Sequence, residues 1–311
     1  MDKHGKILLS GASGMLGSVL RDALTARSQP IIQLVRRPPT SLEQIQWNPA
    51  ATPAIPNPEA LKNISANISA NITAAIHLSG SNVAAHRWTA AYKREIAQSR
   101  IQSTHALASA LAQLRNPPQT LLVASATGIY GNREDQLLDD TSAPGSGFLA
   151  DVCRQWEAAA QPAVQAGIRV VHLRFGVVIG RGPGALAKML PIFRLGLGGP
   201  LGSGQQWMSW ISLEDAVSAI LFLLDTPSLA GPVNLTTPNP VTNAQFTRAL
   251  AQAIHRPAIF RAPNFALRLA LGEMADEALL ASARVYPSKL TSARFRFAHP
   301  TIAPAIHAAL A

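Results

Sequence analysis

Three glycines that follow the first apolar run constrain the fold of this chain more than any other feature. The run 6–10 leads into Gly11, Gly14 and Gly17, and an amphipathic stretch, 18–27, comes next. In a strand-to-helix turn, Gly11 permits the tight bend, Gly14 lets the main chain approach a pyrophosphate, and Gly17 lets the helix pack closely on the strand. Free N–H groups at the helix start would face the anion. The pattern therefore predicts a dinucleotide-binding turn, although a tight turn alone can also use glycine.

The end of the next strand-like run indicates which dinucleotide this turn would hold. The run 31–35 ends about 20 residues after the glycines, where an acidic residue binds the ribose 2′-hydroxyl of NAD. Here the run ends in Arg36 and Arg37. Because two guanidinium groups suit a 2′-phosphate, we expect the cofactor to be NADP. The alternative is a pair of solvated arginines at a strand end.

Length and composition are those of a large α/β protein without a membrane-spanning segment. Of the 311 residues, 48% are hydrophobic and 14% are charged. No apolar run reaches the ~20 residues that span a bilayer, and 1–6 lead directly into the first strand. We expect a cytoplasmic protein with no membrane partner. We interpret the sequons at Asn63, Asn67 and Asn71 as a local repeat in a surface connection.

A formal net charge of +10 raises the possibility of a nucleic-acid partner. The lysines and arginines are scattered along the chain without a run longer than two, and only 5% of the residues are aromatic. Neither a basic stripe nor a stacking platform is therefore visible. We expect no nucleic-acid partner and a small-molecule substrate instead.

Short apolar runs alternate with segments of helical period, which is typical of a Rossmann-type doubly wound parallel sheet. The expected strands are 6–10, 31–35, 74–78, 120–125 and 169–173, and the expected helices between them are 18–27, 87–114 and 147–166. In such folds ligands bind at the carboxyl ends of the strands.

The composition of the sequence changes after Gly180, and the change predicts a second, smaller lobe. Glycine and proline are dense in 180–184 and 196–204, which we interpret as loops or a lid, since 196–204 follows a helical segment and lacks the Gly-Lys-Ser/Thr ending of a triphosphate-binding loop. We expect an NADP-binding domain over 1–180, to which 208–237 return. We expect a mostly helical substrate lobe over 181–311.

The ordered segments of the chain resemble the extended short-chain dehydrogenase/reductase superfamily, and more closely its atypical branch of NAD(P)-dependent epimerase-like proteins. The resemblance covers nearly the whole chain. It rests on 11–17, 77–80, 87–89 with Ser99 and Arg100, 124–131, 147–150 with Trp156 and Glu157, 173–180, 196–204, Trp210 with Ile211, and 287–290.

The resemblance also implies which residues lie at the cofactor. The three glycines are expected at the cofactor, together with Ser13, Met15 and Leu16, which lie between them in the sequence. Leu78 and Ser79, followed by Gly80, are expected on the adenine and ribose side. Three charged residues are implied near the cofactor, namely Glu95, Arg100 and Arg174.

The catalytic pair of most such dehydrogenases is missing from this chain. There, a Tyr and a Lys four residues later share one helix face, and the ammonium group lowers the pKa of the tyrosine. None of the three tyrosines here is followed by such a lysine, and the corresponding positions fall on Leu149 and Cys153. We expect Ser125 and Tyr130 to carry the chemistry instead. The alternative is that Tyr130 is a turn residue packed on the sheet edge.

Cysteine, histidine and tryptophan side chains are further candidates for the site. Cys153 is interpreted as a small buried hydrophobe rather than a nucleophile. The eight histidines show no metal-binding spacing, so no metal is expected, and His86 is interpreted as a solvated loop residue. Trp207 and Trp210 are candidates for stacking on a substrate or for anchoring the core.

Taken together, these features predict an NADP-dependent oxidoreductase or epimerase-like enzyme. It would act on a carbon that bears a hydroxyl or carbonyl group in an unknown small molecule, with nucleotide sugars among the candidates. The alternative is a non-catalytic NADP-binding protein with a regulatory or redox-sensing role, which the missing Tyr/Lys pair favours.

Overall fold

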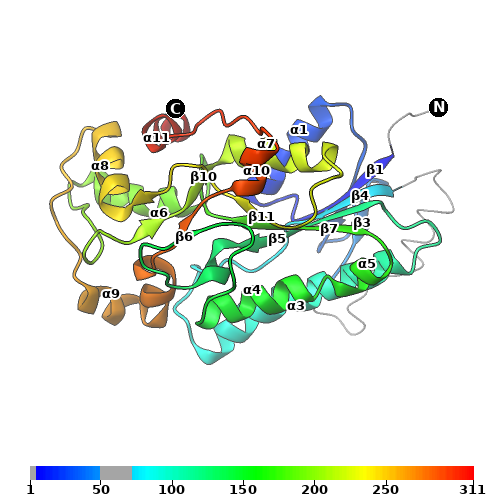
Figure 1. The fold of residues 1–311 in the computed structure, drawn as a ribbon, viewed down its shortest axis with the longest axis horizontal. Helices are drawn as coiled ribbons and strands as arrows, with labels where there is room; N and C mark the ends of the chain where they lie inside the picture. The colour runs from blue at the N-terminus through cyan, green and yellow to red at the C-terminus, as the bar shows by residue number, and fades with distance from the viewer. Residues whose placement is uncertain (1–4, 50–71) are drawn as a thin grey trace.

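A seven-stranded parallel sheet forms the centre of the molecule (Figure 1). The computed structural model describes residues 5–49 and 72–311, so the three sequons lie outside the described residues. The strand order is β11-β7-β5-β4-β1-β2-β3, and all neighbours are parallel. The strands are β1 (Lys6–Ser10), β2 (Ile31–Val35), β3 (Gln44–Gln46), β4 (Ile72–His77), β5 (Thr120–Ala126), β7 (Arg169–Phe175) and β11 (Gly231–Leu235). The predicted Rossmann-type doubly wound sheet is confirmed, with its switch in strand order beside β1.

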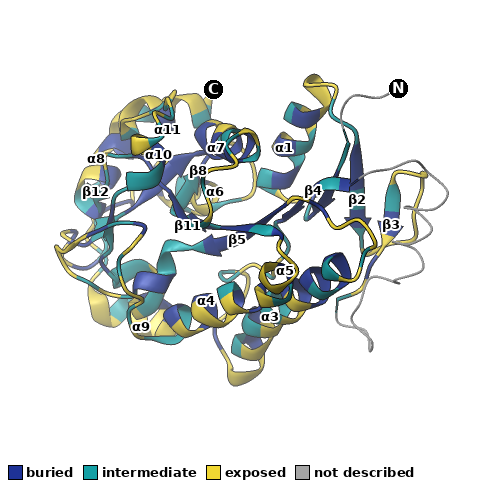
Figure 2. Ribbon diagram, turned by 45° about the vertical axis from the view of Figure 1, so that its right-hand side comes forward, coloured by how far each residue is buried: buried dark blue, intermediate teal, exposed yellow. Residues whose placement is uncertain are grey.

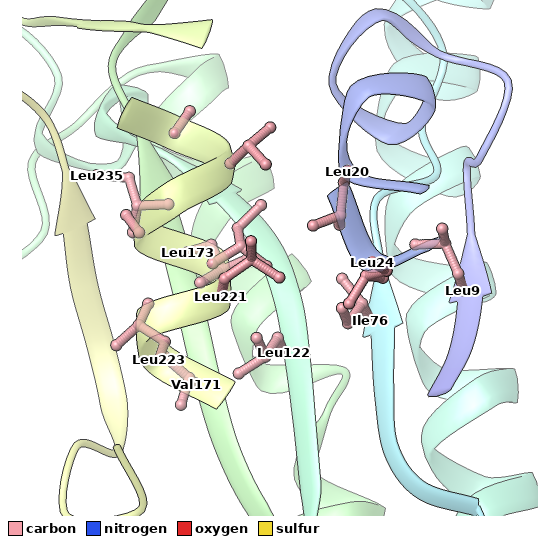
Figure 3. Close-up of a cluster of buried hydrophobic side chains, with 14 of the residues drawn as sticks. Leu9, Leu20, Leu24, Ile76, Leu122, Val171, Leu173, Leu221, Leu223 and Leu235 are labelled. Carbon is pink, nitrogen blue, oxygen red and sulfur yellow. The ribbon is translucent and has the colours of Figure 1, made fainter. Parts of the chain in front are cut away.

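Helices cover both faces of the sheet, because every central strand buries side chains in both directions. One face carries α1 (Met15–Ala26) and α7 (Leu213–Asp225), and the other carries α3 (Ala90–Ala112), α4 (Phe148–Ala158) and α5 (Gln161–Gln165) (Figures 1 and 2). Figure 3 shows the core on the α1 and α7 face, where strand residues such as Leu9 and Ile76 lie beside Leu20 and Leu24 of α1. This packing fixes the start of α1 against the carboxyl end of β1.

A second group of helices lies at the end of the molecule opposite the N-terminus (Figure 1). It comprises α6 (Ala185–Arg194), α8 (Asn243–Ala253), α9 (Asn264–Leu271), a π-helical turn η2 (Ala275–Leu280) and α11 (Ile302–Leu310). The helices α6, α8 and α11 share a separate core that includes Trp210 and Phe246. The core also includes β8 (Val177–Ile179) and β10 (Trp210–Ser212), which pair with each other rather than with the central sheet.

The remaining elements are short and join the two groups. Two pairs of short strands lie outside the central sheet. In one, β6 (Leu137–Leu138) pairs with β13 (Arg284–Val285), and in the other, β9 (Trp207–Met208) pairs with β12 (Val241–Thr242). The 3-10 turn η1 (Thr127–Tyr130) follows β5. The helix α10 (Ser288–Ser292) precedes the C-terminal segment. No helix among the described residues is long and apolar enough to cross a membrane.

Two predicted elements were wrong in detail. The single helix expected over 147–166 is broken between α4 and α5, because Pro162 in the first turn of α5 has no N–H to continue the α4 hydrogen-bond ladder. The first helix begins at Met15 rather than after Gly17, so Gly17 lies inside it.

Candidate cofactor and active site

The glycine turn has the backbone geometry that a pyrophosphate site needs. Gly11 adopts a φ of 75°, and a Cβ there would lie 2.8 Å from the main-chain carbon of Leu78. A Cβ on Gly17 would overlap the carbonyl oxygen of Gly11, so α1 packs directly on the turn. Gly14 donates its N–H to the Gly11 carbonyl over 3.0 Å and immediately precedes α1. Gly11 and Gly17 therefore have steric reasons within the protein to lack a side chain, whereas Gly14 leaves room for a ligand at the start of α1.

The start of α1 is free to bind an anion. The residue before the helix is Gly14, which offers no side-chain cap, and the first turn contains no acidic residue. Ser13 is exposed and Met15 and Leu16 are half-buried. The first N–H groups of a helix without such partners attract negative charge. This region fits a dinucleotide pyrophosphate.

Arg36 and Arg37 directly follow β2, at the same edge of the sheet as the glycine turn. Both side chains are exposed, and among the described residues neither has an acidic partner. Two unpaired guanidinium groups beside an adenosine site can receive a phosphate on the ribose.

The segment after β4 lies against the glycine turn. Leu78 donates its N–H to the Ser10 carbonyl over 3.3 Å, and Leu78 and Ser79 contact the position of a Cβ on Gly11. Both residues are half-buried, and Gly80 is exposed. The structure thus brings Leu78 and Ser79 to the turn, and Gly80 follows them beside Arg100.

Arg100 and Glu95 project from α3 to the segment after Gly80. The Arg100 guanidinium donates to the carbonyl oxygens of Ser81 and Ile96 over 2.9 and 3.0 Å. It also lies over the Trp156 ring, 5.1 Å from the ring centre. The exposed Glu95 accepts a hydrogen bond of 2.9 Å from the Ser81 hydroxyl. Arg100 therefore holds the backbone next to the expected ribose site, and Glu95 holds the Ser81 side chain there.

The loop at 180–184 lies over the start of α1. A Cβ on Gly184 would be 3.2 Å from the Met15 sulfur, and a Cβ on Gly182 would be 3.9 Å from the Met15 side chain. Gly182 has a φ of 102°. The interpretation of 180–184 as a loop beside the cofactor turn is consistent with these contacts.

Ser125 and Arg174 belong to a polar row that crosses three strands at their carboxyl ends. Ser125 on β5 is in register with Arg174 on β7, which is in register with Asn234 on β11. Residues in register on parallel strands point to the same face of a sheet. Glu157 of α4 and Tyr130 of η1 complete the cluster.

The hydrogen bonds of this cluster engage nearly every polar atom. Ser125 donates its hydroxyl to Glu157 over 2.7 Å. Arg174 donates two hydrogen bonds of 2.8 and 2.9 Å to the Glu157 carboxylate and one of 3.0 Å to the Tyr130 hydroxyl. The Tyr130 oxygen also lies 2.7 Å from Asn234 Oδ1 and 2.8 Å from the Asp139 carbonyl oxygen. Ser125 is 2% exposed and Tyr130 is fully buried.

Burial and the ion pair set the charges in the cluster. Burial raises the pKa of Tyr130, and the opposing charge and hydrogen bond of Arg174 do not outweigh it. For Glu157, burial raises the pKa, but the hydrogen bonds and charge of Arg174 outweigh burial and lower it. The same pairing raises the Arg174 pKa against the effect of its own burial. Glu157 and Arg174 are therefore ionised, and Tyr130 is neutral and keeps its proton.

Leu149 and Cys153, which stand where most such dehydrogenases have the Tyr and the Lys, face the turn after β5. A Cβ on Gly128 would contact Leu149 at 3.4 Å and Cys153 at 4.0 Å. Burial raises the pKa of the Cys153 thiol to about 12. The thiol is therefore protonated at neutral pH, as expected of a small buried hydrophobe.

A carboxylate from the second group of helices caps α4. Glu277, in η2, accepts the N–H of Leu149 over 3.1 Å. A Cβ on Gly147, whose φ is 109°, would collide with the same carboxylate. Glu277 thus satisfies a donor at the start of α4 and lies beside the place where the usual tyrosine would be.

The two tryptophans after the glycine-rich loop have different positions. Trp210 is fully buried in the core of the second group of helices. Trp207 is half-buried, donates to Asp135 over 2.7 Å, and has the Arg284 guanidinium 4.5 Å from its ring centre. An open pocket beside Trp207 is lined by Glu134, Asp135 and Gln205 among others. Of the two, only Trp207 lies where a ligand could stack on it.

Sequence reasoning gave no role to Glu157, Asn234 or Glu277. Glu157 belongs to a segment that carries the family resemblance and lies one helical turn after Cys153. Asn234 and Glu277 are distant in sequence from the residues they contact, so no local spacing could have indicated them. The described residues contain no group of His, Cys, Asp and Glu side chains that could hold a metal ion.

Comparison with known proteins agrees with this geometry. The model of the NAD-dependent epimerase/dehydratase family matches residues 7–236, and the model of a domain of unknown function matches 262–309. An epimerase family protein of Mycobacterium bovis is 44% identical over 300 residues, which cover 96% of each chain. The Bos taurus epimerase family protein SDR39U1 is 32% identical over 310 residues, which cover 98% of this chain and 100% of that protein.

Solved structures extend the comparison to three dimensions. The human epimerase family protein SDR39U1, solved with NADPH, superposes with a TM-score of 0.86 at 28% identity, covering 98% of both chains. A UDP-glucose 4-epimerase of Thermus thermophilus, solved with NAD, shares the fold with a TM-score of 0.74 at 18% identity, covering 98% of this chain and 97% of that one. The chain belongs to the NAD-dependent epimerase/dehydratase family, and its fold is that of the nicotinamide-cofactor-binding proteins within it.

Proposed function

We propose that the protein is an NADP-dependent oxidoreductase or epimerase-like enzyme that acts on a carbon bearing a hydroxyl or carbonyl group. The observation that carries the proposal is the uncapped glycine turn with Arg36 and Arg37 beside it. The NADPH in the structure of human SDR39U1 supports the same choice of cofactor. The substrate is a small molecule, and we retain the expectations of a cytoplasmic location and no nucleic-acid partner.

The residues at the sheet edge would bind and orient the cofactor. The N–H groups at the start of α1 would hold the pyrophosphate, and Arg36 and Arg37 would bind the 2′-phosphate. Leu78 and Ser79 would contact the adenosine side, with the backbone there fixed by Arg100. Bound NADP supplies hydride exchange at the substrate carbon.

Ser125 is the side chain that we propose for orienting the substrate oxygen. Its proton is donated to Glu157, so its oxygen can accept a hydrogen bond but has no proton left to donate. Ser125 would thus accept from a substrate hydroxyl, which supports an alcohol as the bound form. Thr127, two residues on, is half-buried and has no hydrogen-bond partner among the described residues, so its hydroxyl is available to donate.

The second candidate function is a non-catalytic NADP-binding protein with a regulatory or redox-sensing role. This function is favoured by the hydrogen bonds of the polar row, because the hydroxyls of Ser125 and Tyr130 are both bound to other groups of the protein. Leu149 has no ionisable group, and the Cys153 thiol, whose pKa burial raises to about 12, is too weak an acid to replace the usual pair.

Turnover of NADPH with a panel of carbonyl compounds and nucleotide sugars tests between the two. The enzyme hypothesis predicts oxidation of NADPH with at least one compound and a lower rate for Ser125→Ala. The matched control is Ser218→Ala, an exposed serine on α7, which should leave the rate unchanged. If NADPH binds normally and no compound turns over, the regulatory role replaces the enzyme.

A further inference from the structure

Large exposed apolar side chains are concentrated at one end of the molecule. Eleven large hydrophobic residues are exposed among the described residues, and seven of them fall in two short segments, 192–197 and 259–269. They are Ile192, Leu195, Leu197, Ile259, Phe260, Phe265 and Leu269, with exposed fractions between 54% and 76%. Scattered exposed hydrophobics are normal, but a concentration of this kind marks an interaction surface.

The two segments lie side by side and form one surface. Phe260 donates its N–H to Gly198 over 3.2 Å, and Ala262 donates to Pro200 over 3.0 Å. The side chain of Arg256 donates to the carbonyl oxygen of Arg194 at the end of α6 over 3.1 Å. The connection into α9 therefore runs along the loop that follows α6, at the left-hand end of Figure 1.

The helix α9 belongs to this surface, and its last residue, Leu271, packs against a small core that includes Trp88 and Met274. None of its residues is buried, and Phe265 and Leu269 are four positions apart, which places them on one helix face. Figure 2 shows the end of the molecule around α9 with many exposed residues. A short apolar helix that buries none of its residues in its own protein has a face available to a partner.

The surface is positively charged. A groove beside the apolar side chains is lined by Arg248, Arg256 and Arg261 together with His255, and no acidic residue lines it. The stretch 226–272 contains four arginines and no aspartate or glutamate. Arg268 pairs with Asp276, so the unpaired cations lie around the groove and the connection into α9.

We propose that this end of the molecule, formed by 192–197 and 255–269, docks on the surface of an anionic lipid bilayer. Apolar side chains that project from a cationic surface are the combination that inserts at the headgroup boundary and is held by anionic lipids. A second copy of the chain fits less well, because a two-fold contact would bring the same arginines together with no acidic side chain to neutralise them. The proposal concerns a peripheral contact, and it replaces the sequence-based expectation that no membrane is a partner.

Flotation with lipid vesicles tests this proposal on the whole protein. Binding is expected to mixed phosphatidylcholine and phosphatidylglycerol vesicles, to be much weaker with phosphatidylcholine alone, and to fall at high salt. The double variant Phe265→Ser and Leu269→Ser should lower the partition coefficient by about tenfold or more. Arg248→Ala with Arg261→Ala should lower it by a similar factor.

Two matched controls distinguish binding through this surface from non-specific adsorption of the protein to vesicles. Val164→Ser alters an exposed apolar residue on α5, and Arg115→Ala removes an exposed arginine after α3, so both should leave vesicle binding unchanged. NADPH affinity should be the same in all these variants, which keeps this test independent of the proposed function. No binding to anionic vesicles, equal losses in the controls, or a stable dimer in sedimentation that Phe265→Ser and Leu269→Ser dissociate would overturn the proposal.

Discussion

At the scale of single residues, Tyr130 shows how a plausible catalytic side chain can be held by its neighbours. Its hydroxyl contacts Arg174, Asn234 and the Asp139 carbonyl, so it links η1 to β7 and β11. These contacts favour the interpretation of Tyr130 as a packed turn residue.

Tyr130→Phe is therefore expected to act on stability. The variant leaves Asn234 Oδ1 and one Arg174 nitrogen without a buried partner, which should lower the free energy of unfolding by about 1–3 kcal/mol. Urea unfolding followed by circular dichroism measures this loss. Unchanged stability together with a large fall in turnover would show instead that Tyr130 takes part in the chemistry.

A second residue-scale prediction concerns His77, which is fully buried on β4. Its Nδ1 lies 2.6 Å from the Ser10 hydroxyl and its Nε2 lies 3.0 Å from the Ser103 hydroxyl. Ser103 donates to the carbonyl oxygen of Ser99, so Nε2 carries the proton and Nδ1 accepts from Ser10. Burial lowers the pKa of His77 from 6.5 to about 4, and the ring is neutral in the folded protein.

Stability should therefore fall in acid through His77. Between pH 6.5 and about 4 the unfolded chain binds a proton that the folded protein does not, so the free energy of unfolding decreases as pH falls and this contribution levels off below about pH 4. The full change is about 3 kcal/mol. Urea unfolding across this range should show a steeper pH dependence for the wild type and for the exposed control His105→Asn than for His77→Asn. Identical slopes in all three proteins would contradict the account.

At the scale of elements, the turn from β1 to α1 separates two roles of glycine. A Cβ on Gly17 meets backbone that cannot move aside, whereas a Cβ on Gly14 would be 3.4 Å from the Gly11 carbonyl oxygen, an approach that small shifts can accommodate. Gly14 also has a φ of −75°, which alanine adopts without strain.

Alanine at the two positions should thus give different results. Gly17→Ala is expected to lower the melting temperature strongly, because α1 must move away from β1. Gly14→Ala should keep the melting temperature and weaken NADPH binding by about tenfold or more, a loss of ~1.4 kcal/mol, because the new methyl group faces the pyrophosphate. Thermal unfolding and calorimetric titration measure both properties, and a Gly14→Ala protein with unchanged affinity would show that the pyrophosphate lies elsewhere.

Elements with a strong local pattern could be predicted from the sequence, and those without one could not. The strands β1, β2, β5 and β7 are short, mostly apolar runs and match the expected ranges. In contrast, β3 has three residues and buries only Ile45, which gives no periodic signal.

One part of the candidate site could likewise be predicted from the sequence, and the other part could not. The cofactor turn is a contiguous segment whose glycines could be read directly. The polar row of Ser125, Arg174 and Asn234 depends on the register of three strands that are joined by long connections, and register is a tertiary property. Sequence reasoning therefore found two members of the row but could not foresee that Glu157 and Tyr130 would occupy their hydrogen-bonding atoms.

At the scale of the whole molecule, two cores are joined across the site by specific polar contacts. Lys93 of α3 pairs with Glu273 beyond α9 at 2.7 Å, and Glu277 caps α4. These two contacts hold the second group of helices against α3 and α4. Its outer end carries the apolar and cationic surface described above, well separated in the fold from the cofactor turn (Figure 1).

The central claim is that the turn before α1 and the arginines after β2 together bind NADP. Calorimetric titration of NADPH and NADH into the wild type, into Arg36→Ala with Arg37→Ala, and into the control Arg115→Ala tests it most directly. We predict that NADPH binds the wild type and Arg115→Ala at least about tenfold more tightly than NADH, and that the double variant loses this preference while still binding NADH. Equal losses for both nucleotides in the double variant, or no heat with either nucleotide in the wild type, would contradict it.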